Sequence, residues 1–253
     1  MANGHISFSE FKIWSECPWR HKLSYLDKLS TFKGNEFTAF GTAVHEVCER
    51  TVKDEEDQTP EAFQAAFSKE LKKLTVDLNK KLVVEMNGQG KALLPEIFPA
   101  LKEYFGEYEI IEAEAQLYEP IKDSELLFKG FIDLVLKTED GKYHIIDWKT
   151  CSWGWDARKK SDKLITYQLT LYKNYYAQKH NLDPKNVETH FALLKRTAKK
   201  NRVEIFRVTS GEKKMKNALK ALDYSIYNIE KSRFVKNRLS CKYCEFYQTK
   251  HCP

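Results

Sequence analysis

The sequence predicts an α/β fold in which a mixed central sheet is flanked by helices. Two observations predict this class. Three β-type runs follow one another near residues 109–119, 126–137 and 143–150, and helical patterns precede and follow them. The 253 residues are enough to bury a full core, and they fit one domain spanning 1–253.

Local signals predict the elements in order. Ser7-Phe-Ser-Glu10 has the pattern of a capping box, which opens a short helix that ends near Pro18. Residues 54–100 have the pattern of a helical insertion that either forms a wall of the site or scaffolds it. The other helices are predicted around 39–54, from Pro60 to about 85, over 91–108 with interruptions at Pro95 and Pro99, around 162–180 and at about 212–232, and two further strands near 188–195 and 202–208.

An Asp-Gly pair joins the second and third strands of the first group. Apolar runs over 131–136 and 143–148 flank Asp140-Gly141, and this combination is the strongest short-range signal of a hairpin. Asp133 interrupts the first run and Asp147 the second. We therefore expect two carboxylates on adjacent antiparallel strands.

Asp147 and Lys149 lie two residues apart in a strand, so their side chains share one face and Trp148 points to the other. The hairpin can bring Asp133 across to them. Two carboxylates and an ammonium on one face are costly unless they bind a metal or each other. A magnesium site with a lysine beside the attacking water suits phosphodiester hydrolysis. The alternative is an ordinary solvated strand end.

Four short motifs occur in a fixed order along the chain. They are Gly41-Thr-Ala-Val-His45, Gly130-Phe-Ile-Asp133, Asp147-Trp-Lys149 and Gln168-Leu-Thr-Leu-Tyr172. In this order they resemble the motifs of the PD-(D/E)XK nuclease superfamily, in the branch that contains the RecB and AddB nuclease domains and Cas4. The resemblance extends from Ser7 to Cys252 and implies the restriction-endonuclease-like core of that superfamily.

The resemblance implies a divalent metal site. His45, Asp133 and Asp147 would ligate Mg²⁺ or Mn²⁺, joined by the backbone carbonyl of Trp148. Imidazole more often suits softer metals, so His45 has the alternative of a hydrogen-bonded helix residue with no ligand role.

The resemblance also implies roles beside the metal. Lys149 would orient or activate the attacking water and stabilise charge on the phosphate. Gln168 and Tyr172 lie four residues apart and share a helix face, from which they would brace Lys149 or contact the substrate phosphate. Without the other motifs, we would interpret Gln168 and Tyr172 as an ordinary polar-aromatic pair on the helix surface.

One further acidic residue lies in the strand Ile110–Leu117. Alternation places Glu114 on the same face as Glu112 and Gln116. Glu114 is therefore either an additional acidic group near the metal or part of a solvent-exposed strand face.

Cysteine usage indicates a second metal site. The sequence shows no signal-peptide pattern and no apolar run of about 20 residues, so we expect a reducing, cytoplasmic location without membrane association. In such a compartment metal ligation competes with disulfide formation. Six cysteines are present: Cys17, Cys48, Cys151, Cys241, Cys244 and Cys252.

Four of these cysteines match the AddB and Cas4 pattern of one N-terminal cysteine before a proline and three at the C-terminus. The resemblance implies a [4Fe–4S] cluster on Cys17, Cys241, Cys244 and Cys252, although the last gap is seven residues where the family commonly has five. The alternative is structural Zn²⁺, on four thiolates or on three with His251. Either metal would staple residues 236–253 to Cys17, and Cys48 and Cys151 would pack as small apolar side chains.

Basic and aromatic residues follow the third strand. Trp153-Gly-Trp155 lies beside Ala157–Lys160 and Lys163, and a second basic run spans Lys195–Arg202. Together with a net charge of +6, they are compatible with phosphate binding that does not read bases, or with ordinary solvated loops. The two tryptophans could stack on unpaired bases or pack in the core.

These features predict a metal-dependent DNA nuclease, an exonuclease on single-stranded ends or flaps in recombination, repair or replication. No Walker A motif is present, so a helicase or recombination partner would be a separate chain. The format resembles stand-alone Cas4-like proteins and phage-encoded recombination nucleases. Two alternatives are a Cas4-like CRISPR adaptation factor and a non-hydrolytic DNA-end-binding protein of the same fold.

Overall fold

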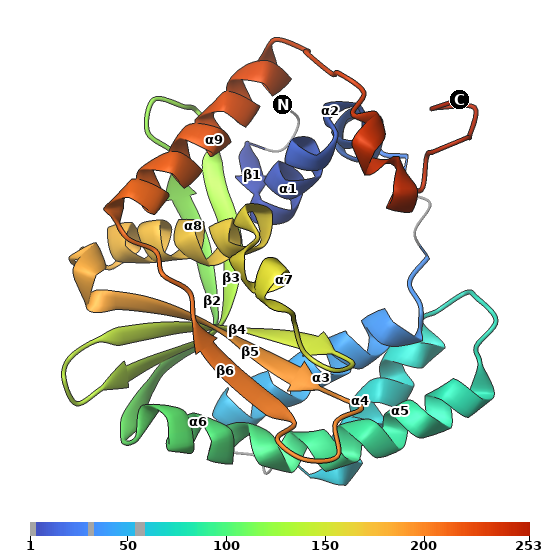
Figure 1. Ribbon diagram of the computed structural model, residues 1–253, viewed down its shortest axis with the longest axis vertical. Helices are drawn as coiled ribbons and strands as arrows, with labels where there is room; N and C mark the ends of the chain where they lie inside the picture. The colour runs from blue at the N-terminus through green and yellow to red at the C-terminus, as the bar shows by residue number, and fades with distance from the viewer. Residues whose placement is uncertain (1–3, 30–32, 54–58) are drawn as a thin grey trace.

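The computed structural model describes residues 4–29, 33–53 and 59–253. A twisted sheet lies between two groups of helices (Figure 1). The helices are α1 (Phe8–Glu16), α2 (Pro18–His21), α3 (Glu36–Lys53), α4 (Pro60–Lys72), α5 (Lys80–Leu93), α6 (Ile97–Phe105), α7 (Ala157–Ser161), α8 (Lys163–Lys179) and α9 (Glu212–Glu230), with shorter turns of 3-10 or π type at η1 (Lys22–Leu26), η2 (Leu94–Glu96), η3 (Pro184–Asn186) and η4 (Arg238–Tyr243). The strands are β1 (His5–Ser7), β2 (Tyr108–Pro120), β3 (Leu127–Thr138), β4 (Tyr143–Cys151), β5 (Val187–Lys195) and β6 (Val203–Arg207).

The six strands form one mixed sheet in the order β1-β3-β4-β5-β6, with β2 beside β3. β2, β3 and β4 form the predicted antiparallel meander, β5 runs parallel to β4, and β6 returns antiparallel to β5. The predicted mixed sheet with flanking helices is therefore confirmed. The short strand β1, parallel to β3, was not predicted because three residues carry too little pattern.

Strand β3 divides one of its edges between two partners. β2 pairs with β3 from residue 127 to residue 138, which occupies one edge along its whole length. On the other edge, β1 pairs with residues 127–129 and β4 with residues 134–137. Residues 130–133 lie between these two stretches, so the sheet splits at Asp133.

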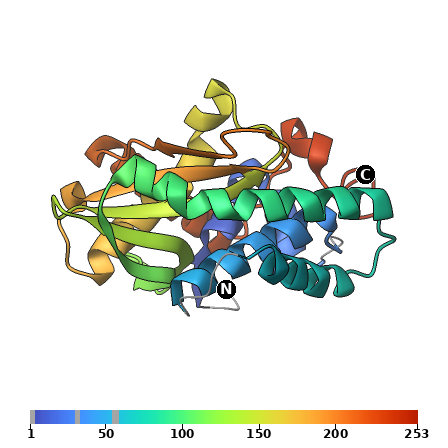
Figure 2. The same ribbon diagram turned by 90° about the horizontal axis from the view of Figure 1, so that it is seen from below.

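Two apolar cores cover the two faces of the sheet. The first packs α1, α8 and α9 on side chains such as Phe128, Ile145 and Phe191. The second packs α3 to α6 on side chains such as Ile146 and Trp148, and Figure 2 shows these helices lying across that face. Consecutive residues Ile145 and Ile146 enter different cores, as the period of a strand requires.

The helices between His45 and the sheet differ from the prediction in two places. The single helix from Pro60 to about 85 is wrong: α4 ends at Lys72, and α5 begins anew where the Asn79 side chain accepts the Leu82 N–H. Pro99 does not interrupt α6, because it lies in the first turn, where a missing N–H leaves no hydrogen bond unmade. No helix of the described ranges is long and apolar enough to cross a membrane.

The predicted cap at Ser7 is half formed. The Ser7 hydroxyl accepts the N–H of Glu10 at 3.1 Å, which begins α1 as expected. The Glu10 carboxylate, however, contacts His21 Nε2 at 2.9 Å. Because α2 follows α1 after Cys17, this contact ties the two short helices together.

Candidate active site

Helix α3 places His45 at the split in the sheet. Gly41 lies one turn earlier, and a Cβ at this position would come within 3.3 Å of Thr150 Oγ1 on β4. The missing side chain therefore lets α3 approach the end of the strand. His45 Nδ1 lies 3.1 Å from Asp133 Oδ1. The glycine and histidine of the first motif thus act together, one as a spacer and the other as a polar group.

Asp133 substitutes for a missing strand partner. Its Oδ2 accepts the backbone N–H of Trp148 at 2.7 Å, beyond the point where β3 and β4 stop pairing. The N–H and C=O of one strand residue point to the same edge, so the Trp148 carbonyl also faces the split. One carboxylate therefore contacts both α3 and β4.

Asp147 is buried and holds two neighbours. Gln168 Nε2 donates to its Oδ1 at 2.6 Å, and Lys149 Nζ lies 2.6 Å from its Oδ2. Burial raises the pKa of Asp147 to about 6, against the opposing charge of Lys149. We expected Gln168 to brace Lys149 or contact the substrate phosphate. In the structure it donates to Asp147, and this carboxylate in turn contacts Lys149.

Glu114 completes a group of three possible metal ligands. One donor atom each from Glu114, His45 and Asp133 lies within 4.8 Å of the other two. Burial, followed by the charge of Asp133, raises the pKa of Glu114. Burial lowers the pKa of His45, but the charge and hydrogen bond of Asp133 outweigh it, and the net shift is upward. Both raised pKa values show that negative charge at Glu114, His45 and Asp133 exceeds the positive charge nearby.

The backbone at Glu114 explains why strand alternation fails there. Its φ is 51°, in the left-handed region that a non-glycine residue adopts at a cost of about 1–3 kcal/mol. Glu112 Oε1 lies 3.9 Å from Lys179 on α8, whereas Glu114 faces His45 on α3. The predicted common face of Glu112, Glu114 and Gln116 is therefore wrong, since the irregular backbone turns Glu114 to the other side.

Tyr172 fills space beside the site. A Cβ at Gly130 would lie 2.8 Å from Cε1 of its ring, so the glycine of the second motif leaves room for this ring. The Tyr172 hydroxyl lies 3.4 Å from Gln168 Nε2, and the ring is buried in the first core. Burial also raises the pKa of its hydroxyl. The buried Tyr172 ring thus holds a hydroxyl next to the Gln168 side chain.

The four cysteines of the predicted cluster meet at one place. Cys17, Cys241, Cys244 and Cys252 line a small cavity of about 20 Å³, together with Trp19 and other residues. Backbone contacts tie the two ends of the chain there: the Trp19 N–H donates to Val235 O at 3.2 Å, and the Asn237 N–H to Cys17 Sγ at 3.3 Å. In Figure 1 the red C-terminal segment lies beside blue α2.

The two other cysteines lie outside this cavity. Cys48 is buried in the second core, and Cys151 is half-buried against the first. They occupy the packing positions expected of small apolar side chains.

Several basic side chains of the two runs pair with other residues of the protein. Lys160 and Lys195 both pair with Glu204, and Arg202 pairs with Glu96. Arg196 donates to Gln89 and Ser152. These four side chains therefore have polar partners within the protein.

The two tryptophans after β4 differ in exposure: Trp155 is packed against the protein and Trp153 is open to solvent. Trp155 packs edge-on against Phe191 at 5.2 Å, with Lys159 Nζ 4.6 Å from its ring. Trp153 is 76% exposed. Trp14 and Trp148 are buried, as core packing requires.

The sequence did not suggest a third polar group. One donor atom each from His144, Glu188 and His190 lies within 4.8 Å of the others. The two histidines are 46 residues apart in different strands, and only the pairing of β4 with β5 brings them together. A histidine within each of two apolar strand runs is the sequence signal that could have indicated this group.

Comparisons with known proteins agree with this architecture. The sequence model of the PD-(D/E)XK nuclease superfamily matches residues 5–249. The chain therefore belongs to this superfamily. A search of curated proteins found no significant match.

One solved structure supports the fold, and a second was aligned with a low score. An exonuclease candidate from Eubacterium rectale superposes with a TM-score of 0.63 at 13% identity, covering 96% of this chain and 87% of the other. The structure of SSO0001 aligns at 15% identity over 94% of this chain and 93% of the other, with a TM-score of 0.39.

Proposed function

We propose that this protein is a metal-dependent DNA nuclease that acts as an exonuclease on single-stranded ends or flaps. The observation that carries this proposal is the convergence of Asp133, Asp147 and Lys149 with His45 and Glu114 at the split in the sheet. Membership of a nuclease superfamily supports the reaction class. The likeness in fold to the exonuclease candidate from Eubacterium rectale supports the choice of an exonuclease.

The side chains at the split fit a hard divalent cation. Three carboxylates lie around one imidazole, and the pKa values of Glu114 and Asp147 are raised because burial, and then the charge of Asp133, oppose their ionisation. Mg²⁺ and Mn²⁺ prefer such oxygen-rich sites. Asp133, Asp147 and His45 would hold the ion with the Trp148 carbonyl, and Glu114 would add an acidic group.

When bound, the cation would supply positive charge that polarises the phosphodiester and makes a nearby water more acidic. Lys149 would orient that water and offset the charge that accumulates on the phosphate during attack. Its ammonium is held 2.6 Å from Asp147, which Gln168 fixes from the other side. The hydrogen bond from Gln168 thus positions the lysine through Asp147.

Several surface features support DNA as the substrate. The net charge is +6, and Trp153 is available to stack on an unpaired base just beyond β4. Such stacking favours single strands over duplexes. We propose that helices α4 to α6, within the predicted insertion 54–100 and its continuation, form one wall of the DNA channel. A helicase or recombination partner would supply the single strand.

We also propose that Cys17, Cys241, Cys244 and Cys252 hold a [4Fe–4S] cluster, as in the AddB and Cas4 branch. Their convergence on one small cavity supports a shared metal site. The AddB and Cas4 cysteine pattern favours iron–sulfur, and four thiolates around one Zn²⁺ are the alternative.

The cluster would act as a staple of one domain spanning 1–253. Residues 236–253 contact Cys17 and Trp19 near the start of the chain, so holding them together opposes fraying of both ends. This role needs no redox change.

An assay with end-labelled DNA tests the proposed function. We expect single-stranded DNA to be shortened from its ends in Mg²⁺ or Mn²⁺, more slowly as a duplex, and not at all in EDTA. A folded, metal-loaded protein that binds DNA without cutting it would instead support the non-hydrolytic DNA-end-binding alternative. Cleavage only within a complex that includes an integrase would support the CRISPR adaptation alternative.

A further inference from the structure

A second polar cluster lies on β4 and β5, on the opposite face of the sheet from Asp147. Parallel pairing sets His144 beside Glu188 and Ile146 beside His190. Because β4 alternates, His144 points toward Phe105 at the end of α6, whereas Asp147 points toward Gln168 on α8. The cluster is therefore separate from the candidate active site.

The two histidine rings present nitrogen atoms to each other. His144 Nδ1 lies 3.1 Å from His190 Nε2, and a donor atom of Glu188 lies within 4.8 Å of both rings' donors. Two nitrogens bound to one tetrahedral ion with bonds of about 2.0–2.1 Å are roughly 3.3 Å apart. The observed separation thus needs only a small adjustment to admit an ion.

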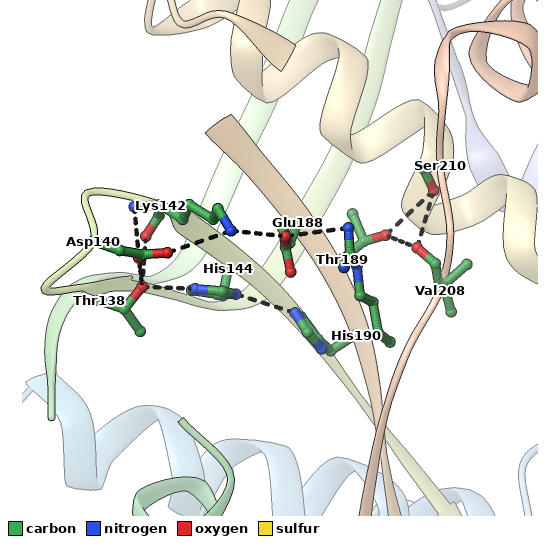
Figure 3. A network of polar contacts seen from close by, with 10 residues as sticks. Thr138, Asp140, Lys142, His144, Glu188, Thr189, His190, Val208 and Ser210 are labelled. Carbon is green, nitrogen blue, oxygen red and sulfur yellow. Dashed lines mark hydrogen bonds and ion pairs between the residues drawn. The ribbon is translucent and has the colours of Figure 1, made fainter. Parts of the chain in front are cut away.

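A hydrogen-bond relay fixes the tautomer of His144 (Figure 3). Thr138 Oγ1 lies 2.6 Å from Asp140 Oδ1 and 2.9 Å from His144 Nε2. The ionised carboxylate can only accept, so Thr138 donates to Asp140 and accepts the Nε2–H of His144. The lone pair of His144 is then on Nδ1, which faces His190. Carboxylate-ordered histidines of this kind are typical of metal ligands.

His190 can change tautomer. Without an ion, its Nε2–H donates to the lone pair of His144 Nδ1. Within the described part of the chain, its Nδ1 is buried and has no hydrogen-bond partner. The proton of His190 can therefore move from Nε2 to Nδ1 when Nε2 takes up an ion.

Glu188 forms two ion pairs with exposed cations. Arg207 Nη2 at 3.1 Å and Lys142 Nζ at 3.5 Å both approach Oε1. The side chains of Arg207 and Lys142 are 58% and 43% exposed, so both cations can turn toward solvent. The Glu188 carboxylate can then offer an oxygen to an ion at the histidines.

The surroundings keep both imidazoles neutral. Burial lowers the pKa of His144, and burial together with the neighbouring ring lowers the pKa of His190 to about 3. Phe105 lies 4.9 Å from the ring of His144 and 5.0 Å from that of His190. Neutral, packed rings bind a metal without first releasing a proton to water.

We propose that His144, His190 and Glu188 bind a divalent transition-metal ion of the zinc class. Two imidazoles and one carboxylate are the ligand set of open Zn²⁺ sites, and imidazole selects such ions over Mg²⁺. The cluster borders an open hollow of about 630 Å³, from which water or a small anion can reach a fourth position. Bound there, the ion links β4 to β5, the two strands behind the candidate active site.

Metal counting after equilibrium dialysis tests this inference. The full-length protein is dialysed against buffered micromolar Zn²⁺, alongside His190→Gln and Glu188→Gln. We expect wild type to retain one more equivalent of zinc than His190→Gln, and Glu188→Gln to bind that equivalent at least about tenfold more weakly. Melting curves in EDTA show whether each variant is folded, and Glu188→Gln preserves shape if His190→Gln does not fold.

Two controls separate this site from the others. Asp133→Ala must keep the extra equivalent, since it alters only the candidate active site. With Co²⁺ in place of Zn²⁺, the difference spectrum between wild type and His190→Gln must show visible bands without thiolate charge transfer, because the four cysteines contribute equally to both proteins. Equal zinc content in wild type and both folded variants would overturn the inference, as would loss of the equivalent in Asp133→Ala alone. Failure of DNA cleavage would leave these outcomes unaffected.

Discussion

The two polar clusters on β4 offer different ligand atoms from opposite faces of one strand. At Asp147 the sheet is split, the backbone at Glu114 is in a left-handed conformation, and carboxylates outnumber cations. At His144 the strands pair regularly, and two neutral imidazoles dominate. Oxygen-rich sites suit Mg²⁺ and nitrogen-rich sites suit Zn²⁺. A spacing of three residues therefore suffices to give one strand two clusters of different metal preference.

The two clusters also differ in backbone strain and in side-chain packing. Glu114 adopts a backbone conformation that costs free energy, and Asp147 is a buried acid with a raised pKa. The histidine cluster has aromatic contacts and an ordered relay through Thr138. Backbone strain and closely spaced like charges are expected at a catalytic site. Unstrained geometry is expected where an ion only holds two strands together.

The largest expected effect follows from Asp133→Ala. This variant removes the carboxylate that contacts both His45 and Trp148, and with it charge stabilisation in the transition state. We expect cleavage of end-labelled single-stranded DNA to fall by about 10²–10³-fold or more. DNA affinity, measured by fluorescence anisotropy, should stay equal or rise because a negative charge facing phosphate is gone. Near-normal cleavage by the folded variant would contradict the assignment.

The four cysteines form a third candidate metal site, which one substitution can disrupt. Cys241→Ser takes one thiolate from the shared cavity, so binding energy that is also folding energy is lost. We expect a fall in melting temperature of roughly 10 °C, corresponding to several kcal/mol, with weaker DNA binding. Cys48→Ser, at a packing position, is the matched control and should change DNA binding little. Equal melting temperatures for the two anaerobically prepared variants would reject the staple.

The buried acid predicts a pH dependence in metal-free protein. The folded pKa of Asp147 is raised to about 6, above its unfolded value, so its ionisation costs stability. The free energy of unfolding should fall as pH rises from about 4 to 6. Asp147→Asn removes this loss and should be about 1–3 kcal/mol more stable than wild type at pH 8 in EDTA, with no gain near pH 4. Urea titrations at both pH values measure it; a constant difference would refute the buried-acid account.

A smaller effect is expected from Trp153→Ala. If the exposed ring stacks on one base, its loss should weaken single-stranded DNA binding by about 1 kcal/mol, roughly fivefold, with an unchanged melting temperature. Tyr224→Ala, at an exposed aromatic of α9, serves as the control. Equal affinities of the two variants would assign Trp153 no part in binding.

The sequence predicted the sheet better than the site around it. Strand runs and the Asp140-Gly141 turn predict β2, β3 and β4 because apolar alternation and turn chemistry are local signals. The motif order predicts that Asp133, Asp147 and Lys149 lie together. The helix break before α5 was missed because Asn79 as a cap is a weak signal beside a continuing apolar period.

Three features could not be predicted because they depend on long-range pairing. The split at Asp133 arises from β1 and β4 sharing one edge of β3, and β1 has almost no sequence pattern. Glu114 leaves its expected face through a single backbone angle. His144 and His190 meet only after β4 pairs in parallel with β5. Registers of this kind are set by tertiary packing rather than local sequence.

One cleavage experiment compares the catalytic role of the cluster at Asp147 with that of the cluster at His144. Initial rates on end-labelled single-stranded DNA in Mg²⁺ are measured for wild type, Lys149→Ala and His190→Gln, with DNA affinity and melting temperature for each. We predict that Lys149→Ala binds DNA but loses at least about 100-fold in rate, because the group that orients the water is gone, whereas His190→Gln cleaves within a few fold of wild type. A folded, DNA-binding Lys149→Ala that cleaves at the wild-type rate would contradict the account.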